Sequence, residues 1–230
     1  MFVWEGIYKS YADLPVYKEF DSELWVIRQR EKLEDVSKNT DKYLIENKLL
    51  MSVLQDNASV LDYGGSLGLT YKALKPLFKL NYNIVETKTI CDVGKNIFKN
   101  EIQFFEKIPT NINSLDVLYI RTALQYAQNW KNDIINLLKL CPQKIVLAHL
   151  SSGNIPTYLT LQKWYGTEIP YWFINEIELT DLIESYGYRV INRGFSESIE
   201  HWFKKTDGSY SVPSDYVLMN TIDIIFEKIK

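Results

Sequence analysis

The chain has 230 residues, of which 46% are hydrophobic and 24% charged, and this composition predicts a globular domain that buries its own core. A formal net charge of −3 without a basic block argues against a nucleic-acid partner, and the lack of a long apolar run argues against a membrane span. The two cysteines, Cys91 and Cys141, lack the spacing of metal ligands, and the N-terminus lacks the pattern of a secretory signal. We therefore expect a cytoplasmic protein with reduced thiols.

The first 57 residues are expected to form an aromatic and helical extension that belongs to the same domain as residues 58–230. Residues 1–20 are rich in aromatic side chains and are expected to be irregular, because Pro15 opposes a continuous helix. A helix is predicted over 21–36. Its apolar stripe is assigned to Leu24, Ile27 and Val36.

A second helix is predicted over 40–55, with Thr40 or Asp41 as its N-cap. Its apolar positions are Leu44, Leu49, Val53 and Leu54. From residue 58 onward, short apolar runs alternate with helical segments. The expected strands are 58–63, 82–86, 102–105, 115–120 and 144–150, and the expected helices are 67–79, 90–99 and 127–140. Continuously apolar strands in such an alternation are typical of a parallel sheet covered by helices on both faces.

The end of the chain follows a different pattern. Two strand-like runs, 186–195 and 216–229, have no full helix between them and predict an antiparallel strand pair that completes the sheet. Pro76 is expected to end or bend the first crossover helix near Lys75. The predicted fold is α/β, a Rossmann-like, doubly wound and mostly parallel sheet with an antiparallel C-terminal strand and a helical N-terminal extension.

The stretch "VLDYGGSLG" (60–68) follows the first expected strand and opens a helix. Ligands of doubly wound sheets bind outside the carboxyl ends of the strands. Gly64, Gly65 and Gly68 allow a sharp turn and a close approach of backbone to ligand. The following helix adds unpaired N–H groups and a positive dipole end. Such a loop suits either a dinucleotide pyrophosphate or the carboxylate of a methionyl cofactor.

Two carboxylates help to separate these cofactor classes. Asp62 lies two residues before the first glycine, where it opposes a pyrophosphate but suits a cationic amino group. The glycine spacing also differs from the G-x-G-x-x-G pattern of nicotinamide enzymes. Glu86 ends the second expected strand, where a carboxylate commonly accepts hydrogen bonds from both ribose hydroxyls of either cofactor class. Asp62 therefore favours the methionyl cofactor.

At these residues the sequence resembles the class I S-adenosylmethionine-dependent methyltransferases, whose first motif is an acidic residue followed by a glycine-rich turn. Ser66 stands where the usual middle glycine is found, and Gly65 lies one place earlier. The whole chain resembles a bacterial family of methyltransferases often encoded among surface-polysaccharide or O-antigen genes. The blocks that carry this resemblance are "WEGIYKSYADLP" (4–15), "LDYGGSLG" (61–68), "NIVET" (83–87), "ALQY" (123–126), "LTLQ" (159–162) and "IPYWF" (169–173).

The resemblance implies S-adenosylmethionine as cofactor and a cofactor site around the strand ends. Its candidate residues are Asp62, Gly64, Gly65, Ser66, Gly68, Glu86, Phe105, Thr122, Gln125 and Tyr126, with Phe105 and the neighbouring Glu106 flanking the adenine. A hydroxyl acceptor also needs a group that removes its proton. His149, at the end of the fifth strand, and His201 are the candidate general bases. In this chain "AHLSSG" replaces the acidic, Arg-containing segment of that strand end.

The acceptor is expected to be a small molecule, most plausibly a sugar or a glycan intermediate methylated on oxygen. The long segment after the fifth strand carries Gln162 and Trp164 as candidate acceptor contacts. Tyr8 and Tyr11, with Trp4, either cover the cleft or pack the N-terminus onto the domain. No compact metal-ligand cluster stands out. Two alternatives stay open: a non-catalytic cofactor-binding module of the same shape, and a nicotinamide-dependent oxidoreductase.

Overall fold

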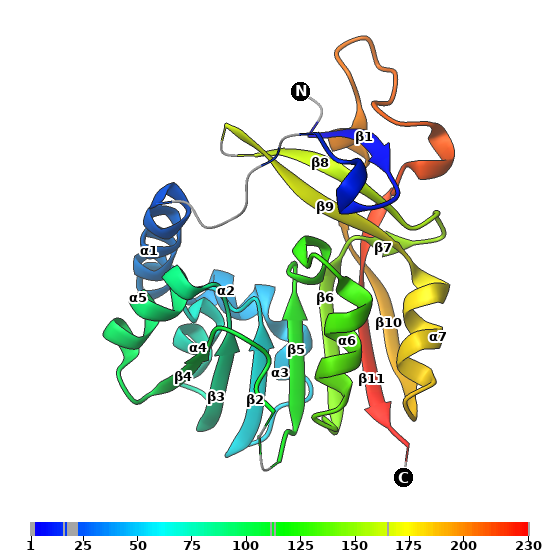
Figure 1. The fold of residues 1–230 in the computed structure, drawn as a ribbon. Coiled ribbons are helices and arrows are strands. Elements are labelled where there is room, and N and C mark those ends of the chain that lie inside the picture. Colours follow the sequence, from blue (N-terminus) through cyan, green and yellow to red (C-terminus); the bar gives the residue numbers. More distant parts are fainter. Residues whose placement is uncertain are drawn as a thin grey trace.

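The computed structural model describes residues 3–15, 17, 23–110, 112, 114–164 and 166–229. Figure 1 shows a large sheet with helices on both faces and a smaller sheet above the ends of its strands. None of the helices in these ranges is long and apolar enough to cross a membrane.

The large sheet has seven strands in the order β10-β11-β6-β5-β2-β3-β4. The strands are β2 (Ala58–Tyr63), β3 (Leu80–Val85), β4 (Ile102–Phe105), β5 (Val117–Arg121), β6 (Lys144–Leu150), β10 (Tyr188–Ser198) and β11 (Asn220–Lys228). The five strands from β2 to β6 pair in parallel, whereas β11 runs antiparallel to both of its neighbours, β6 and β10. The predicted α/β fold and its antiparallel C-terminal strand are confirmed.

The central strands are apolar at nearly every position because both faces of the sheet are buried. In β5, Leu118 and Ile120 pack into one core, and Val117 and Tyr119 pack into the other. Successive side chains of a strand point to opposite faces, so an uninterrupted apolar run fills both cores. Each fully buried aliphatic side chain contributes about 1.5–3 kcal/mol to the free energy of unfolding.

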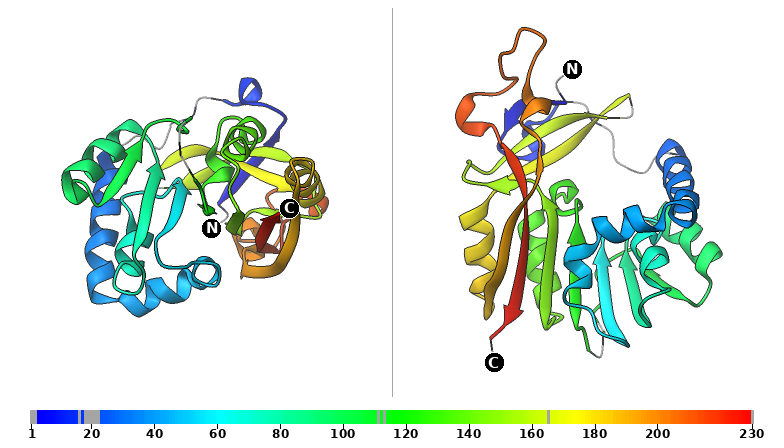
Figure 2. Two further views of the ribbon diagram at one scale, coloured as in Figure 1. Left: turned by 90° about the horizontal axis from the view of Figure 1, so that it is seen from below. Right: turned by 180° about the vertical axis from the view of Figure 1, so that it is seen from behind.

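Helices cover both faces, as the doubly wound fold requires (Figure 2). One face is covered by α6 (Trp130–Leu138) and α7 (Glu176–Glu184). The other is covered by α1 (Glu23–Lys38), α2 (Thr40–Glu46), α3 (Lys48–Met51), α4 (Leu69–Leu74) and α5 (Lys88–Phe98). The first crossover helix, α4, ends two residues before Pro76, with Lys75 as its C-cap, as predicted.

The N-terminal helices differ from the prediction in the apolar stripe of the first, in an interruption of the second, and in its N-cap, which is Asn39 and not Thr40 or Asp41. Helix α1 buries Gln29, Leu33 and Val36, which confirms the predicted apolar stripe at Val36. Its assignment to Leu24 and Ile27 was wrong, because these side chains are 43% and 47% exposed. The second predicted helix is interrupted at Asn47, which separates α2 from α3. The buried Asn47 amide donates to the Tyr43 carbonyl and accepts from Thr70 and Tyr119, and such local side-chain bonds compete with a continuous helix.

A second sheet of four strands, in the order β1-β8-β9-β7, was not expected from the sequence. Its strands are β1 (Trp4–Tyr8), β7 (Ser152–Gly153), β8 (Tyr158–Trp164) and β9 (Thr167–Asn175). Strands β8 and β9 form an antiparallel hairpin, and β1 pairs with β8 across more than 150 residues of chain. The expectation of an irregular segment over residues 1–20 was therefore wrong for 4–8, which pair with this distant strand.

The second sheet packs on an aromatic core of its own. Trp4 is fully buried, and its ring lies 4.9 Å from Phe173 and 4.6 Å from Phe203, between ring centroids. Four short 3-10 turns connect the elements: η1 (Tyr11–Asp13), η2 (Leu124–Tyr126), η3 (Glu200–Phe203) and η4 (Ser214–Tyr216). The η2 turn contacts β9 and thereby links the two sheets.

Candidate functional site

The glycine-rich loop between β2 and α4 bends back over the end of β2. Gly64 has φ +75°, and a Cβ at this position would overlap the Cβ of Ala123. A Cβ on Gly65 would lie 2.6 Å from the Asp62 carboxyl group. Only glycine fits these two positions, because the backbone runs against neighbouring atoms on one side and borders a cleft on the other.

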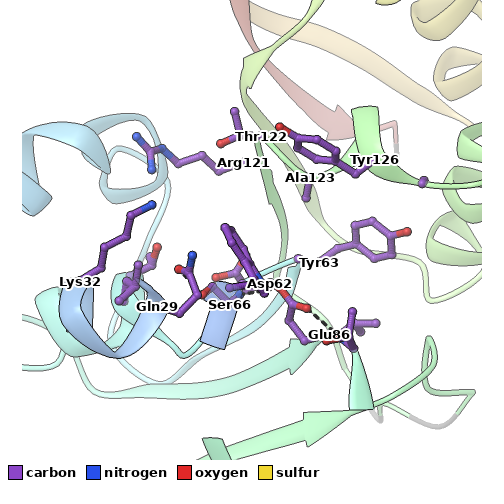
Figure 3. Close-up of a pocket in the computed structure, with 18 of the residues that line it drawn as sticks. Gln29, Lys32, Asp62, Tyr63, Ser66, Glu86, Arg121, Thr122, Ala123 and Tyr126 are labelled. Carbon is purple, nitrogen blue, oxygen red and sulfur yellow. Dashed lines mark hydrogen bonds between the residues drawn. The ribbon is translucent and has the colours of Figure 1, made fainter. Parts of the chain in front are cut away.

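The cleft has a volume of about 1180 Å³ and lies at the carboxyl ends of β2, β3 and β5 (Figure 3). The second sheet forms its opposite wall, and α1 and α2 form its side. Pockets for one drug-sized ligand span about 300–1000 Å³, so this cleft is slightly larger than a typical single-ligand pocket.

Asp62 lies at the base of the cleft with its side chain almost completely buried. Its Oδ2 accepts a hydrogen bond of 2.7 Å from the Tyr82 hydroxyl. Burial raises the pKa of Asp62 to about 7, and the nearby Glu86 carboxylate acts in the same direction, while Tyr82 and Arg121 oppose the shift. A cationic ligand group next to this buried carboxyl group would stabilise its ionised form and lower its pKa again.

Glu86 follows β3 and holds the loop from the other side. Its Oε1 accepts from the backbone N–H of Ser66 at 3.1 Å, and its Oε2 accepts from the N–H of Thr87 at 2.8 Å. Each carboxylate oxygen has two lone pairs, so a carboxylate can accept from a backbone N–H and from a ligand hydroxyl group at the same time. Glu86 therefore positions the loop and also lines the cleft.

Three residues that line the cleft have buried polar atoms without a hydrogen-bond partner among the described residues: Gln29 Nε2, Thr87 Oγ1 and Arg121 Nε. Such orphaned groups are rare in folded proteins, because each costs about 1–3 kcal/mol. Three of the eight such atoms in the described ranges belong to residues that line this cleft, which fits a site for a polar ligand. Sequence reasoning did not select these residues, although a glutamine within the apolar stripe of α1 was a visible signal.

The wall formed by the second sheet has a different character. Tyr126 of η2 donates a hydrogen bond of 2.8 Å to Gln162 Oε1 of β8 and so bridges the two walls. The lining residues of β8, β9 and η3 are Gln162, Trp164, Ile169, Pro170, Tyr171 and Trp202. None of them is charged. All charged lining residues in the described ranges belong to α1, α2 or the ends of the large sheet.

Eleven of the residues predicted from the sequence line the cleft: Tyr11, Asp62, Gly64, Gly65, Ser66, Glu86, Glu106, Thr122, Tyr126, Gln162 and Trp164. Residues from six separate stretches of the chain thus meet at one place. Six predicted site residues are absent from the lining, as is Trp4: Tyr8, Gly68, Phe105, Gln125, His149 and His201.

The first four of these six have identifiable structural surroundings. Tyr8 folds its ring over Gly6 of β1, and Gly68 caps α4 with φ +72°. Phe105 is half-buried against the core under α6 and α7. Gln125 is fully buried, and its Nε2 donates to the His149 carbonyl at 3.3 Å.

The two histidines lie away from the cleft lining. His149 has φ +51°, its N–H donates to Asp223 Oδ1 at 2.9 Å, and its Nδ1 lies 3.1 Å from the Ser196 hydroxyl. Burial, helped by the Arg121 charge, lowers the pKa of His149 against the opposite influence of Asp223. His201 is exposed on η3, with its ring 5.2 Å from that of Trp202 between centroids.

The described ranges contain no group of three or more His, Cys, Asp or Glu side chains that could hold a metal ion. Cys91 is buried and Cys141 is exposed, and both are free thiols.

No protein-family model matches the chain, and no curated protein matches its sequence. Solved structures match its fold. A chain from the complex of the Haloferax volcanii Trm112 methyltransferase activator with its methyltransferase aligns with 94% of this chain and 98% of its own length, at 13% identity and a TM-score of 0.61.

Two further matches are similar in extent. Burkholderia thailandensis 1,6-didemethyltoxoflavin-N1-methyltransferase, solved with 1,6-didemethyltoxoflavin and S-adenosylhomocysteine, aligns with 95% of this chain and 93% of its own, at 13% identity and a TM-score of 0.55. An S-adenosylmethionine-dependent methyltransferase from Clostridium acetobutylicum aligns with 84% of this chain and 92% of its own length, at 11% identity and a TM-score of 0.53. The chain has the fold of the class I S-adenosylmethionine-dependent methyltransferases.

Proposed function

We propose that this protein is an S-adenosylmethionine-dependent methyltransferase that acts on a small, uncharged polar acceptor, most plausibly a hydroxyl group of a sugar or glycan intermediate. The observation that carries the proposal is the cradle formed by Asp62, the glycine-rich loop and Glu86. This cradle lies in a cleft where a Cβ on either Gly64 or Gly65 would meet a neighbouring side chain.

The cradle fits the chemistry of this cofactor. Asp62 is buried and suits the cofactor's ammonium group, because a cation next to it stabilises the carboxylate. Glu86 is placed to accept hydrogen bonds from two neighbouring ribose hydroxyls. The orphaned Thr87 Oγ1 and Arg121 Nε offer further polar contacts. When bound, S-adenosylmethionine supplies a methyl group on a sulfonium, which an acceptor lone pair can take as the carbon–sulfur bond breaks.

The acceptor is assigned to the wall formed by the second sheet. Trp164 and Trp202 offer apolar ring faces, and Gln162 and Tyr126 offer polar groups beside them. This combination suits a sugar ring, which has apolar faces and hydroxyl edges. A phosphate or carboxylate bound to this wall would lose hydration without gaining a cation from its lining side chains.

His149 and His201 remain candidates for the proton acceptor. His201 is the better placed of the two, since its ring packs on Trp202, which lines the acceptor wall. His149 is held by Ser196 and Asp223 and does not line the cleft.

Calorimetry with S-adenosylhomocysteine tests the cofactor assignment. We expect a Kd on the order of micromolar, and a strong loss of affinity in Asp62→Ala and Glu86→Ala. Heat of binding with NAD instead would favour the oxidoreductase. Binding of S-adenosylhomocysteine without methyl transfer to any acceptor would favour the non-catalytic module.

A further inference from the structure

Helix α1 places an unpaired amide donor in the wall of the cleft. The Gln29 side chain is 1% exposed and lines the cleft, and its Nε2 has no hydrogen-bond partner among the described residues. A buried amide donor that stays unpaired costs about 1–3 kcal/mol. An acceptor supplied by a bound molecule would remove this cost without a change of fold.

Gln29 lies on the buried face of α1, where the other buried side chains are apolar. The helix buries Gln29, Leu33 and Val36, which share one face at spacings of four and three residues. Leu33 and Val36 are apolar, and both belong to the hydrophobic cores. A leucine would serve packing at Gln29 equally well, so packing alone does not account for the amide.

The glycine-rich loop fixes the direction of the amide. Gln29 Oε1 accepts a hydrogen bond of 2.7 Å from the Ser66 hydroxyl. Ser66 also donates its N–H to Glu86, so the amide is tied to the loop and, through it, to the ribose-binding candidate. With Oε1 engaged by Ser66, Nε2 is left as the unpaired donor of the amide. This hydrogen bond gives a structural explanation for a serine at position 66 in place of the usual glycine.

Cationic side chains that suit an anionic acceptor line the cleft on the side of α1, together with the carboxylates of Glu31, Asp35 and Glu46. Lys32 lies one turn further along α1 and lines the same cleft, and Arg121 with its orphaned Nε extends from β5 toward the same side (Figure 3). Arg121 is paired with Glu46 through another nitrogen, at 3.2 Å. The carboxyl group of Asp62 lies beneath the loop and suits the opposite charge.

We infer that Gln29 is a cofactor-binding residue whose Nε2 donates to the carboxylate at the amino-acid end of the bound cofactor, with Lys32 adding its positive charge. This inference rests on the proposed function and extends it. Asp62 and Gln29 would divide the zwitterionic amino-acid group between them, the ammonium to the strand and the carboxylate to the helix. The N-terminal extension is then part of the binding site.

The test compares two ligands that differ only in that carboxylate: S-adenosylhomocysteine and its decarboxylated analogue. Both are titrated by calorimetry into the wild-type protein, Gln29→Leu, Gln29→Glu and the control Arg30→Gln on the exposed side of α1. We expect the wild type and Arg30→Gln to prefer S-adenosylhomocysteine. Gln29→Leu should lose about tenfold or more in affinity for it, and less than about twofold for the analogue.

Gln29→Glu adds a test of the donor direction. A carboxylate here repels the ligand carboxylate, so we expect a larger loss than in Gln29→Leu. Tighter binding by Gln29→Glu would overturn the inference, because it would place the ligand ammonium at α1. An equal loss for both ligands, or an unchanged preference in Gln29→Leu, would overturn it as well. If the wild type binds neither ligand, the proposed function itself fails.

Discussion

The Tyr82 hydroxyl donates a hydrogen bond of 2.7 Å to the Asp62 carboxyl group, and both side chains are buried beneath the glycine-rich loop. One hydrogen bond does not compensate for the loss of water around a carboxylate, and the pKa of Asp62 accordingly rises to about 7. The protein therefore keeps a carboxyl group at a position where it lowers stability, which is typical of a ligand site.

This arrangement makes stability depend on pH in a defined direction. The folded pKa of Asp62 lies above the unfolded one, so its favourable contribution is complete below about pH 4 and is lost as the pH rises through about 7. Asp62→Asn cannot ionise, and we expect it to melt at a higher temperature than the wild type at pH 8, with the difference shrinking toward pH 4. Thermal melts across this range check it. A variant less stable than the wild type at pH 8 would contradict the prediction.

Glu86→Gln should weaken binding of S-adenosylhomocysteine by about tenfold or more. The substitution removes the charge of the carboxylate, which accepts hydrogen bonds from ligand hydroxyl groups. It also replaces one carboxylate oxygen by an NH₂ group, which cannot accept the hydrogen bond from the N–H of Ser66 or Thr87. Glu101→Gln is the control, since Glu101 is exposed, pairs with Lys75 and does not line the cleft. Calorimetry measures the affinity of both variants for S-adenosylhomocysteine. Equal affinities would show that Glu86 does not bind the ligand.

Gly64→Ala tests the close packing of the loop. Gly64 and Gly187 both have positive φ, but only Gly64 lacks room for a Cβ, because Ala123 occupies that space. Gly187→Ala should cost about 1–2 kcal/mol of unfolding free energy from backbone strain alone. Gly64→Ala should cost more and also weaken S-adenosylhomocysteine binding. Urea unfolding of both variants measures the difference in unfolding free energy. Equal losses would show that the loop can shift to make room for the added Cβ.

Trp4→Ala tests whether β1 is an integral part of the second sheet. Trp4 is fully buried among aromatic rings, so its truncation should cost about 3–5 kcal/mol. Phe195→Ala, at a site 68% exposed, should cost less than about 1 kcal/mol. Denaturant unfolding provides both values. A small effect of Trp4→Ala would show that the N-terminal strand is only loosely attached.

The uncharged wall formed by the second sheet predicts the charge of the acceptor. With saturating S-adenosylhomocysteine present, phenyl β-glucoside should bind about tenfold more tightly than phenyl β-glucuronide, since the glucuronide must desolvate a carboxylate. Trp164→Ala should weaken glucoside binding by removing a ring face. Tryptophan fluorescence titrations report both effects. Equal or tighter binding of the glucuronide, or no binding of the glucoside, would contradict the assignment.

The sequence predicted the large sheet well because its strands are buried on both faces and therefore appear as uninterrupted apolar runs. β2 and β6 match their predicted bounds, and β3 and β5 differ by one or two residues at their ends. The second sheet could not be predicted in this way. β1 is only five residues long, and its partner β8 follows it by more than 150 residues.

The candidate site was predictable where a local motif marks it, as at Asp62, Gly64 and Glu86. Gln29 belongs to no such motif; its buried position in α1 was the only signal, and its hydrogen bond with Ser66, 37 residues away, appears only in the fold. The histidines were predicted from their positions in the sequence, but neither lines the cleft. His149 lies at the expected strand end, yet its positive φ accompanies a register irregularity between β6 and β11, and Asp223 fixes its backbone.

The topology of β11 constrains the order in which the chain can fold. It lies between β6 and β10, although it follows both in the sequence. Until residues 220–228 are made, β6 presents an open edge and β10 has no neighbour to pair with. Synthesis of most of the chain therefore cannot complete the sheet, and folding is expected to follow translation of β11. During that interval the exposed edge of β6 is the segment most in need of protection from aggregation.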